Sequence, residues 1–176
     1  MGLILAFTVW ITEQSFGITW IIAVRNQLYE KTERVTNIGL SALDSTWPKQ
    51  VKSNGKVLVI IEGLSMYLSR EENKRILSII KDNFPDVTVM MECLAKRWIN
   101  REDVEKSIQK TGEKFKFGAD CFADIQDIAS GYRCVKDDNI SKGMVKLYPV
   151  LKPFQNLSFI QKMIQKILIF KAESVH

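Results

Sequence analysis

Residues 57 to 61 read Val57-Leu58-Val59-Ile60-Ile61, an apolar run rich in β-branched side chains. The turn-forming residues Ser53-Asn54-Gly55 precede this run and give it a defined beginning. A continuous apolar run of this length is typical of a strand in a parallel sheet, where both faces are buried. We therefore predict a central strand over residues 57 to 61 that is covered on both faces.

The helix that follows this strand has a clear beginning and a clear end. Ser69-Arg70-Glu71-Glu72 matches a capping box, in which the Ser69 hydroxyl accepts from a helical N–H and Glu72 accepts from the Ser69 N–H. Apolar residues recur at spacings of three and four along one face: Ile76, Ile79, Ile80 and Phe84. Pro85 is expected to end the helix, because a residue that precedes proline avoids the helical conformation.

Other apolar runs extend this unit into a sheet. Val87 to Glu92 is predicted to be a second buried strand, parallel to the first because a helix connects them. Tyr132 to Val135 is predicted to begin a further strand. Lys166 to Lys171 is predicted to be the last strand and to pair with the strand near Arg133 in an antiparallel orientation. Upstream, Ile18 to Val24 and Arg34 to Leu40 are also predicted strands. The sequence thus predicts an α/β fold whose mostly parallel sheet ends in an antiparallel pair.

Two further helices complete the predicted domain. One runs from its cap Asn100 to Gly112, and the other covers Ala123 to Ser130 and is closed by Gly131. With 176 residues, of which 46% are hydrophobic, the chain is long enough for one core and too short for two. We therefore predict a single domain over residues 1–176.

The composition excludes several classes of function. The 25 Lys and Arg are mingled with 20 Asp and Glu, which favours a mixed surface over a nucleic-acid interface. The three cysteines form no C-x-x-C pair and are odd in number, so reduced thiols in a cytoplasmic protein are expected. The single histidine is His176, which argues against Ser-His-Asp and Cys-His catalysis and against a His-rich zinc site.

The N-terminal segment Met1 to Val24 is almost entirely apolar. It lacks the basic region and the small-residue cleavage site of a signal peptide. A membrane span needs about 20 apolar residues, and Glu13 within it would cost roughly 2.5 to 3.5 kcal/mol. We expect strands of the domain core here, with a membrane anchor as the less favoured alternative.

Polar residues that follow the predicted strands are the candidate ligands, because open parallel sheets bind ligands at the carboxyl ends of their strands. Asp44 can accept a hydrogen bond from an exocyclic amine such as that of adenine, while Leu43 packs the ring. Glu62 can pair with a cationic amino group, and Gly63 allows the backbone to approach a ligand closely. Glu92 occupies the same position after the next strand.

Each candidate also has an ordinary structural explanation. Asp44 is suited to an Asx turn before Ser45-Thr46-Trp47. Glu62 could pair with a nearby lysine, and Tyr67 could be a core aromatic residue. Spacing alone therefore leaves both explanations open for these residues.

Two segments in order resemble a known family. Val59 to Glu72 contains Glu62-Gly63-Leu64-Ser65-Met66-Tyr67-Leu68, which resembles the E-G-x-x-M-Y-L segment of the leucine carboxyl methyltransferase family and its polyketide O-methyltransferase relatives. Arg34 to Trp47 is similar to the preceding strand of that family and its L-D-x-x-W loop. The resemblance covers roughly Arg25 to Glu173 and weakens after Glu92.

The resemblance implies a Rossmann-like class I fold that uses S-adenosylmethionine to methylate an oxygen of a carboxylate or hydroxyl group. It implies that Leu43 and Asp44 lie against the adenine. It also implies that Glu62, with Gly63 beside it, binds the methionine amino group and that Tyr67 lies toward the acceptor. No metal is required, the acceptor is a small molecule or a peptide, and the catalytic residues stay unassigned.

The sequence departs from this family at its beginning. The family starts with a strand and a glycine-rich turn, G-x-G-x-D-x-R, and a second strand ends in an acid that binds the ribose. Here Gly2 and Gly17 stand alone, and Ile18 to Val24 leads into Arg25 with no acid. The first strand and the turn are thus missing or replaced within the atypical residues 1–24, and the helical cover of the substrate is absent. Each unreplaced contact to a charged group is worth roughly 1.5 to 3 kcal/mol, so weaker cofactor binding is expected.

Three alternatives follow from these departures. The first is a methyltransferase-like domain, whether active or degenerate. The second is a non-catalytic interaction module that forms homo-oligomers through an exposed sheet edge. A dinucleotide-dependent oxidoreductase is disfavoured, since the sequence contains no G-x-G-x-x-G.

Overall fold

The computed structural model describes residues 3–8, 27, 37–51, 55–99, 114–139 and 165–173. These ranges contain the strands β1 (Leu3–Thr8), β2 (Val57–Glu62), β3 (Val87–Cys93), β4 (Tyr132–Asn139) and β5 (Lys166–Ala172). They also contain the α-helix α2 (Arg70–Asn83) and the 3-10 helices η1 (Trp47–Gln50), η2 (Ser65–Tyr67), η3 (Lys96–Trp98) and η4 (Phe122–Ile125).

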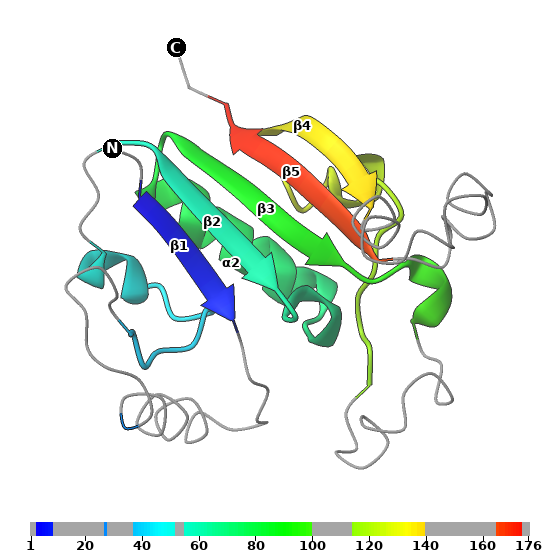
Figure 1. Cartoon of the computed structure of the whole chain (residues 1–176), viewed down its shortest axis with the longest axis horizontal. Coiled ribbons are helices and arrows are strands. Elements are labelled where there is room, and N and C mark those ends of the chain that lie inside the picture. The colour runs from blue at the N-terminus through cyan, green and yellow to red at the C-terminus, as the bar shows by residue number, and fades with distance from the viewer. Residues whose placement is uncertain are drawn as a thin grey trace.

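The five strands form one sheet in the order β1-β2-β3-β5-β4 (Figure 1). β1, β2 and β3 are parallel, whereas β5 is antiparallel to both β3 and β4. Four strands therefore run in one direction and β5 runs in the other. Arg133 pairs with Lys171, so the predicted antiparallel pair near the C-terminus is present. The predicted α/β fold, with a mostly parallel Rossmann-like sheet and a C-terminal antiparallel pair, is confirmed.

β1 comes from the apolar N-terminal segment. It pairs in parallel with β2, with Leu3 beside Val57 and Thr8 beside Glu62. The expectation that the segment Met1 to Val24 supplies strands of the sheet is therefore confirmed for residues 3 to 8. The predicted strand Ile18 to Val24 lies outside the described residues. None of the helices in the described ranges is long and apolar enough to cross a membrane.

Helix α2 begins and ends as its sequence predicts. The Glu72 N–H donates to Ser69 Oγ at 3.2 Å, and the Ser69 N–H donates to Glu72 Oε2 at 2.7 Å, which completes the capping box. The last helical residue is Asn83, and Phe84, before Pro85, has a non-helical backbone while its N–H still donates to Ile80 O. The apolar face of α2 is buried in the core: Ile76, Leu77, Ile79 and Ile80.

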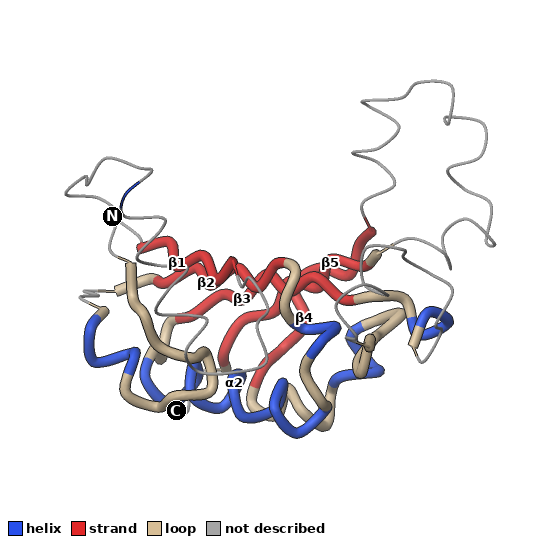
Figure 2. The backbone as a smooth tube through the Cα atoms, turned by 90° about the horizontal axis from the view of Figure 1, so that it is seen from below, coloured by secondary structure: helices blue, strands red, loops and turns tan. Residues whose placement is uncertain are grey.

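The two faces of the sheet are covered unequally. Side chains on one face are fully buried: Val59, Val89, Met91 and Phe170. Those on the other face are only half-buried: Leu58, Ile60, Met90 and Ile169. The prediction that β2 is covered on both faces therefore holds for one face only, because the described helices all lie on the same side of the sheet (Figure 2).

Three other predictions differ from the structure or lie beyond it. Residues 37–40 form no strand, and Ile38 and Leu40 contact the core as partly buried loop residues instead. Residues 123–130 form no continuous helix: η4 ends at Ile125, and turns follow in which Ile125 O accepts from the Ile128 and Ala129 N–H groups. The predicted helix from Asn100 to Gly112 lies outside the described residues.

Candidate functional site

The loop after β2, residues 63–69, begins with a specific backbone conformation. Gly63 has φ +64°, a left-handed conformation that favours glycine. Its N–H donates to Glu92 Oε2 at 2.9 Å, which joins the carboxyl ends of β2 and β3. An ideal Cβ at Gly63 would have no heavy atom within 4 Å, so the space beside this backbone is open. Glu62, directly before it, is exposed.

Buried polar residues hold the rest of this loop, which we call the β2 loop. Ser65 is fully buried, and its hydroxyl donates to the carbonyl oxygen of Glu92 at 2.5 Å. Asn73 on α2 is 2% exposed, and its amide donates to the carbonyl oxygens of Ser65 at 3.0 Å, Leu68 at 3.3 Å and Ser69 at 3.0 Å. These contacts keep buried backbone carbonyls hydrogen-bonded and fix the shape of the loop.

The sequence analysis gave no role to Asn73. Its position was nevertheless readable, because Asn73 precedes Ile76 and Leu77 at spacings of three and four and so lies on the apolar face of α2. A polar residue at such a position needs hydrogen-bond partners, and here the partners are loop carbonyls. The structure thus identifies Asn73 as a support of the candidate site.

Tyr67 lies in a small apolar cluster beside the main core. Its ring is 5.3 Å from the ring of Phe115, and buried Met66 and Leu94 complete the cluster. The N–H groups of residues 116 and 117 both donate to the carbonyl oxygen of Met66, which ties this segment to the β2 loop. Tyr67 is half-buried. The structure therefore supports its packing role, and a contact with a substrate stays a prediction.

The loop that carries Leu43 and Asp44, residues 41–47, is held by local hydrogen bonds and by buried Trp47, whose ring stacks on that of Phe84. Asp44 Oδ1 accepts from the Thr46 N–H at 2.8 Å and from the Thr46 hydroxyl at 2.7 Å. These two hydrogen bonds lower the pKa of Asp44. The indole N–H of Trp47 donates to Ala42 O at 3.1 Å, and Leu43 packs against the edge of the core. The Asx turn considered for Asp44 is therefore present, and its role toward adenine stays a prediction.

The predicted ligands lie on two separate segments. Glu62 and Gly63 lie at the carboxyl end of β2, and the structure brings Glu92 into contact with Gly63. The segment with Leu43 and Asp44 lies on the β1 side of the sheet (Figure 1). Sequence analysis noted Glu92 only as a residue that follows a strand, and its contact with Gly63 is what the structure adds.

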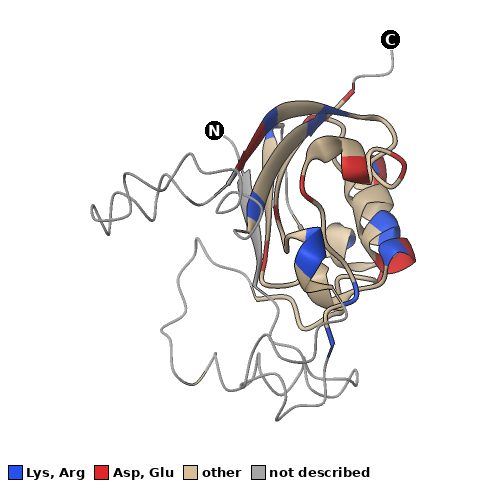
Figure 3. Cartoon of the chain, turned by 90° about the vertical axis from the view of Figure 1, so that its right-hand side faces the viewer, with Lys and Arg blue, Asp and Glu red and all other residues tan. Residues whose placement is uncertain are grey.

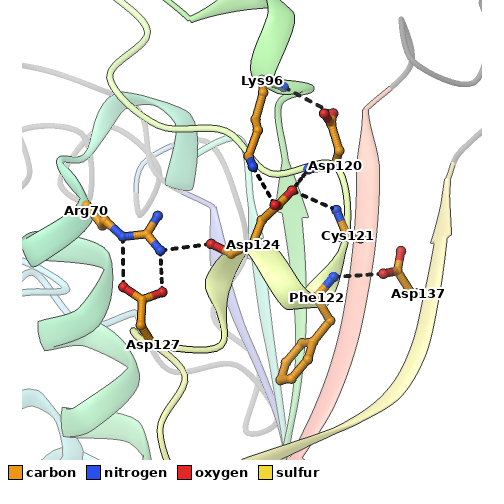
Figure 4. Close-up of polar contacts among 8 residues, drawn as sticks. All are labelled: Arg70, Lys96, Asp120, Cys121, Phe122, Asp124, Asp127 and Asp137. Carbon is orange, nitrogen blue, oxygen red and sulfur yellow. Dashed lines mark hydrogen bonds and ion pairs between the residues drawn. The ribbon is translucent and has the colours of Figure 1, made fainter.

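A polar network fixes the segment around η4 to the same end of the sheet (Figure 4). Arg70 pairs with Asp127, and Lys96 pairs with Asp124. Asp124 also accepts from the N–H groups of residues 120 and 121, at 2.8 and 3.3 Å. Partial burial raises the pKa of Asp124, but Lys96 and these N–H groups outweigh it and hold the pKa below its usual value. The described elements carry both charge signs side by side, as the composition predicts (Figure 3).

The cysteines are free thiols with different surroundings. Cys93 is fully buried at the end of β3, and desolvation raises its pKa to about 12. A thiol that stays protonated at neutral pH is a poor nucleophile. Within the described ranges, no group of three His, Cys, Asp or Glu side chains is placed to hold a metal ion.

No family model matches the chain. It is 26% identical, over 98 residues, to the tetracenomycin polyketide synthesis O-methyltransferase TcmP of Streptomyces glaucescens. The match covers 56% of this chain and 36% of TcmP, so the chain spans little more than a third of that protein. It is also similar, at 12% identity and a TM-score of 0.43, to a crystal structure of the mycolic acid cyclopropane synthase CmaA1 complexed with SAH and CTAB. That alignment covers 84% of this chain and 65% of the other.

Proposed function

We propose that this chain is a class I methyltransferase domain that binds S-adenosylmethionine and methylates an oxygen. The observation that carries this proposal is the similarity to the O-methyltransferase TcmP over 98 residues. The mostly parallel sheet supports it, because such sheets bind ligands at the carboxyl ends of their strands. Because the match covers only 36% of TcmP, methyl transfer by this chain is itself a proposal.

The residues at the end of β2 fit the amino-acid part of this cofactor. Glu62 is exposed and offers a carboxylate to the cofactor's ammonium group. The open space beside Gly63 lets the ligand approach the backbone. Asp44, whose carboxylate is oriented by Thr46, is proposed to bind the adenine amino group while Leu43 contacts the ring.

The bound cofactor supplies a methyl group on a sulfonium together with its leaving group. The protein therefore has to align the acceptor oxygen and exclude water, and no catalytic acid or base is assigned. The proposed acceptor is the carboxylate or hydroxyl group of a small molecule or peptide. Tyr67, which is half-buried beside Phe115, is the candidate for contact with it.

Isothermal titration with S-adenosylmethionine and S-adenosylhomocysteine tests the proposal. We expect both to bind the parent chain, and we expect Glu62→Ala to weaken binding about tenfold to a hundredfold, the value of a lost hydrogen bond to a charged group. Glu71→Ala is the matched control, because Glu71 is an exposed acid on the neighbouring helix. No heat of binding from the parent at millimolar ligand contradicts the proposal.

A second candidate function is a non-catalytic interaction module. β1 lies at one end of the described strand order, and a strand at a sheet edge can pair with a strand of another chain. Sedimentation velocity over a series of concentrations distinguishes the two functions. A dimer that forms without ligand supports the module, whereas a monomer that binds S-adenosylhomocysteine removes it.

A further inference from the structure

Glu92 contacts the β2 loop through both its side chain and its backbone. Its Oε2 accepts from the Gly63 N–H at 2.9 Å, and its carbonyl oxygen accepts from the Ser65 hydroxyl at 2.5 Å. It is half-buried, unlike the exposed Glu62. Glu92 therefore joins β3 to the first residues of the loop that follows β2.

The register places Glu92 beside Glu62. β2 and β3 are parallel, and the last recorded pair of residues is Ile61 with Met91. The next residue along each strand is an acid, so the two acids lie on the same face at the same end of the sheet. Glu92 directs one side-chain oxygen to the Gly63 N–H, and this hydrogen bond favours a fixed side chain.

Gly63 is the covalent neighbour of Glu62, and its left-handed conformation sets the direction in which the chain leaves β2. A residue without a Cβ moves easily between conformations, so an added hydrogen bond has a large effect on its position. Glu92 supplies that hydrogen bond. Glu92 therefore holds the peptide unit that directly follows Glu62.

We propose that Glu92 is a positioning residue, which holds Gly63 so that Glu62 presents its carboxylate to the ammonium group of the ligand. This inference rests on the proposed function, because it concerns the same cofactor site. Glu92 acts through position rather than through its charge. An amide at residue 92 keeps an acceptor oxygen for the Gly63 N–H, whereas an alanine does not.

Two substitutions and two ligands test this role. S-adenosylhomocysteine carries the amino group that Glu62 binds, and 5′-methylthioadenosine lacks it. We expect Glu92→Ala to weaken binding of S-adenosylhomocysteine about fivefold, the equivalent of one neutral hydrogen bond, and to leave 5′-methylthioadenosine within twofold of the parent. Glu92→Gln should bind both ligands within about twofold of the parent, since it keeps the acceptor.

A double substitution shows whether Glu92 acts through Glu62. Once Glu62→Ala has removed the carboxylate, adding Glu92→Ala should change the affinity for S-adenosylhomocysteine by less than about twofold, because coupled residues are not additive. Exchange of the Gly63 amide hydrogen, followed by NMR, should be faster in Glu92→Ala than in Glu92→Gln. This exchange measurement reports the contact without any ligand.

The outcomes separate this inference from the proposed function. If the parent binds neither ligand, the proposed function fails and the ligand role of Glu92 fails with it. If the parent binds both and Glu92→Ala binds as the parent does, only the role of Glu92 is overturned. The role is also overturned if Glu92→Gln loses as much affinity as Glu92→Ala, or if Glu92→Ala weakens both ligands equally.

Discussion

The two segments that carry the predicted cofactor residues are held by different kinds of contact. In the β2 loop, the hydrogen bonds that Gly63 and Ser65 donate reach Glu92, 29 and 27 positions along the chain. In the loop of residues 41–47, the hydrogen bonds of Asp44 and Trp47 span two and five positions. The first loop therefore depends on the assembled sheet, whereas hydrogen bonds within a short stretch of chain define the second.

This difference predicts unequal responses to mutation. A loop held by buried partners shares the free energy of folding, so losing such a partner destabilises the whole domain. The Asp44 turn is held by exposed groups of Thr46, so losing them should cost the domain little, whereas Trp47 anchors the end of this loop in the core. Substitutions in and around each of the two loops test whether their responses differ.

The largest effect is expected at Asn73. Replacing it with alanine removes a buried donor shared by the carbonyl oxygens of residues 65, 68 and 69, although residues 65 and 69 keep a backbone N–H partner. A buried group left unsatisfied costs about 1 to 3 kcal/mol. We expect the free energy of unfolding in urea to fall by about 3 kcal/mol. Asn83→Ala is the control, since Asn83 lies on the same helix, is exposed and donates to Ile79 O alone among the described groups. Equal losses for the two variants contradict the comparison.

Gly118 should show the next largest effect. An ideal Cβ there would lie 2.6 Å from the backbone oxygen of Leu94, so alanine forces the backbone to move. The N–H groups of residues 116 and 117, just before Gly118, donate to Met66 O in the β2 loop. We expect Gly118→Ala to lower the free energy of unfolding by about 1 to 3 kcal/mol. Gly39→Ala is the matched control, because nothing lies within 4 Å of a Cβ at Gly39. A Gly118→Ala variant as stable as Gly39→Ala would show that this contact relaxes freely.

The Asp124 network should make stability depend on pH. Although partial burial opposes it, the pKa of Asp124 in the folded chain is lowered, chiefly by Lys96. This contribution is present above the unfolded pKa, near 3.9, and is lost as the pH falls through the folded value. Between pH 5 and pH 2.5, the melting temperature of Asp124→Asn should fall less than that of the parent. Lys96→Met should flatten the curve in the same way, and parallel curves for all three chains argue against the ion pair.

The smallest effect on stability is expected at Asp44. Its partners belong to Thr46, two residues away, so Asp44→Ala should leave the melting temperature close to that of the parent. Its effect on the binding of S-adenosylhomocysteine should be much larger than its effect on folding. Thermal unfolding and titration of the same preparation measure both. A variant that unfolds as readily as Asn73→Ala removes the distinction between the two loops.

Much of the fold follows from short stretches of sequence. The β-branched run of β2, the capping box of α2 and the stop at Phe84-Pro85 act within a few residues, and each lies where the sequence predicts it. The helix predicted over residues 123–130 does not form, and contacts with distant residues hold this segment instead. The side chains of Asp124 and Asp127 pair with Lys96 and Arg70, which are distant in sequence, and the segment closes in turns.

The sequence by itself determined where the main strands and α2 lie, and it singled out Glu62 and Gly63, because strand ends and caps follow from local chemistry. Only the tertiary structure decided that β5 lies between β3 and β4, that one face of the sheet is better covered, and that Asn73 and Glu92 support the β2 loop. The strand order and the Glu92 contact join residues that are tens of positions apart, and the Asn73 bonds require α2 to dock on the loop. None of these three arrangements can be read from the periodicity of the sequence, because periodicity shows which face is buried and not which partner buries it.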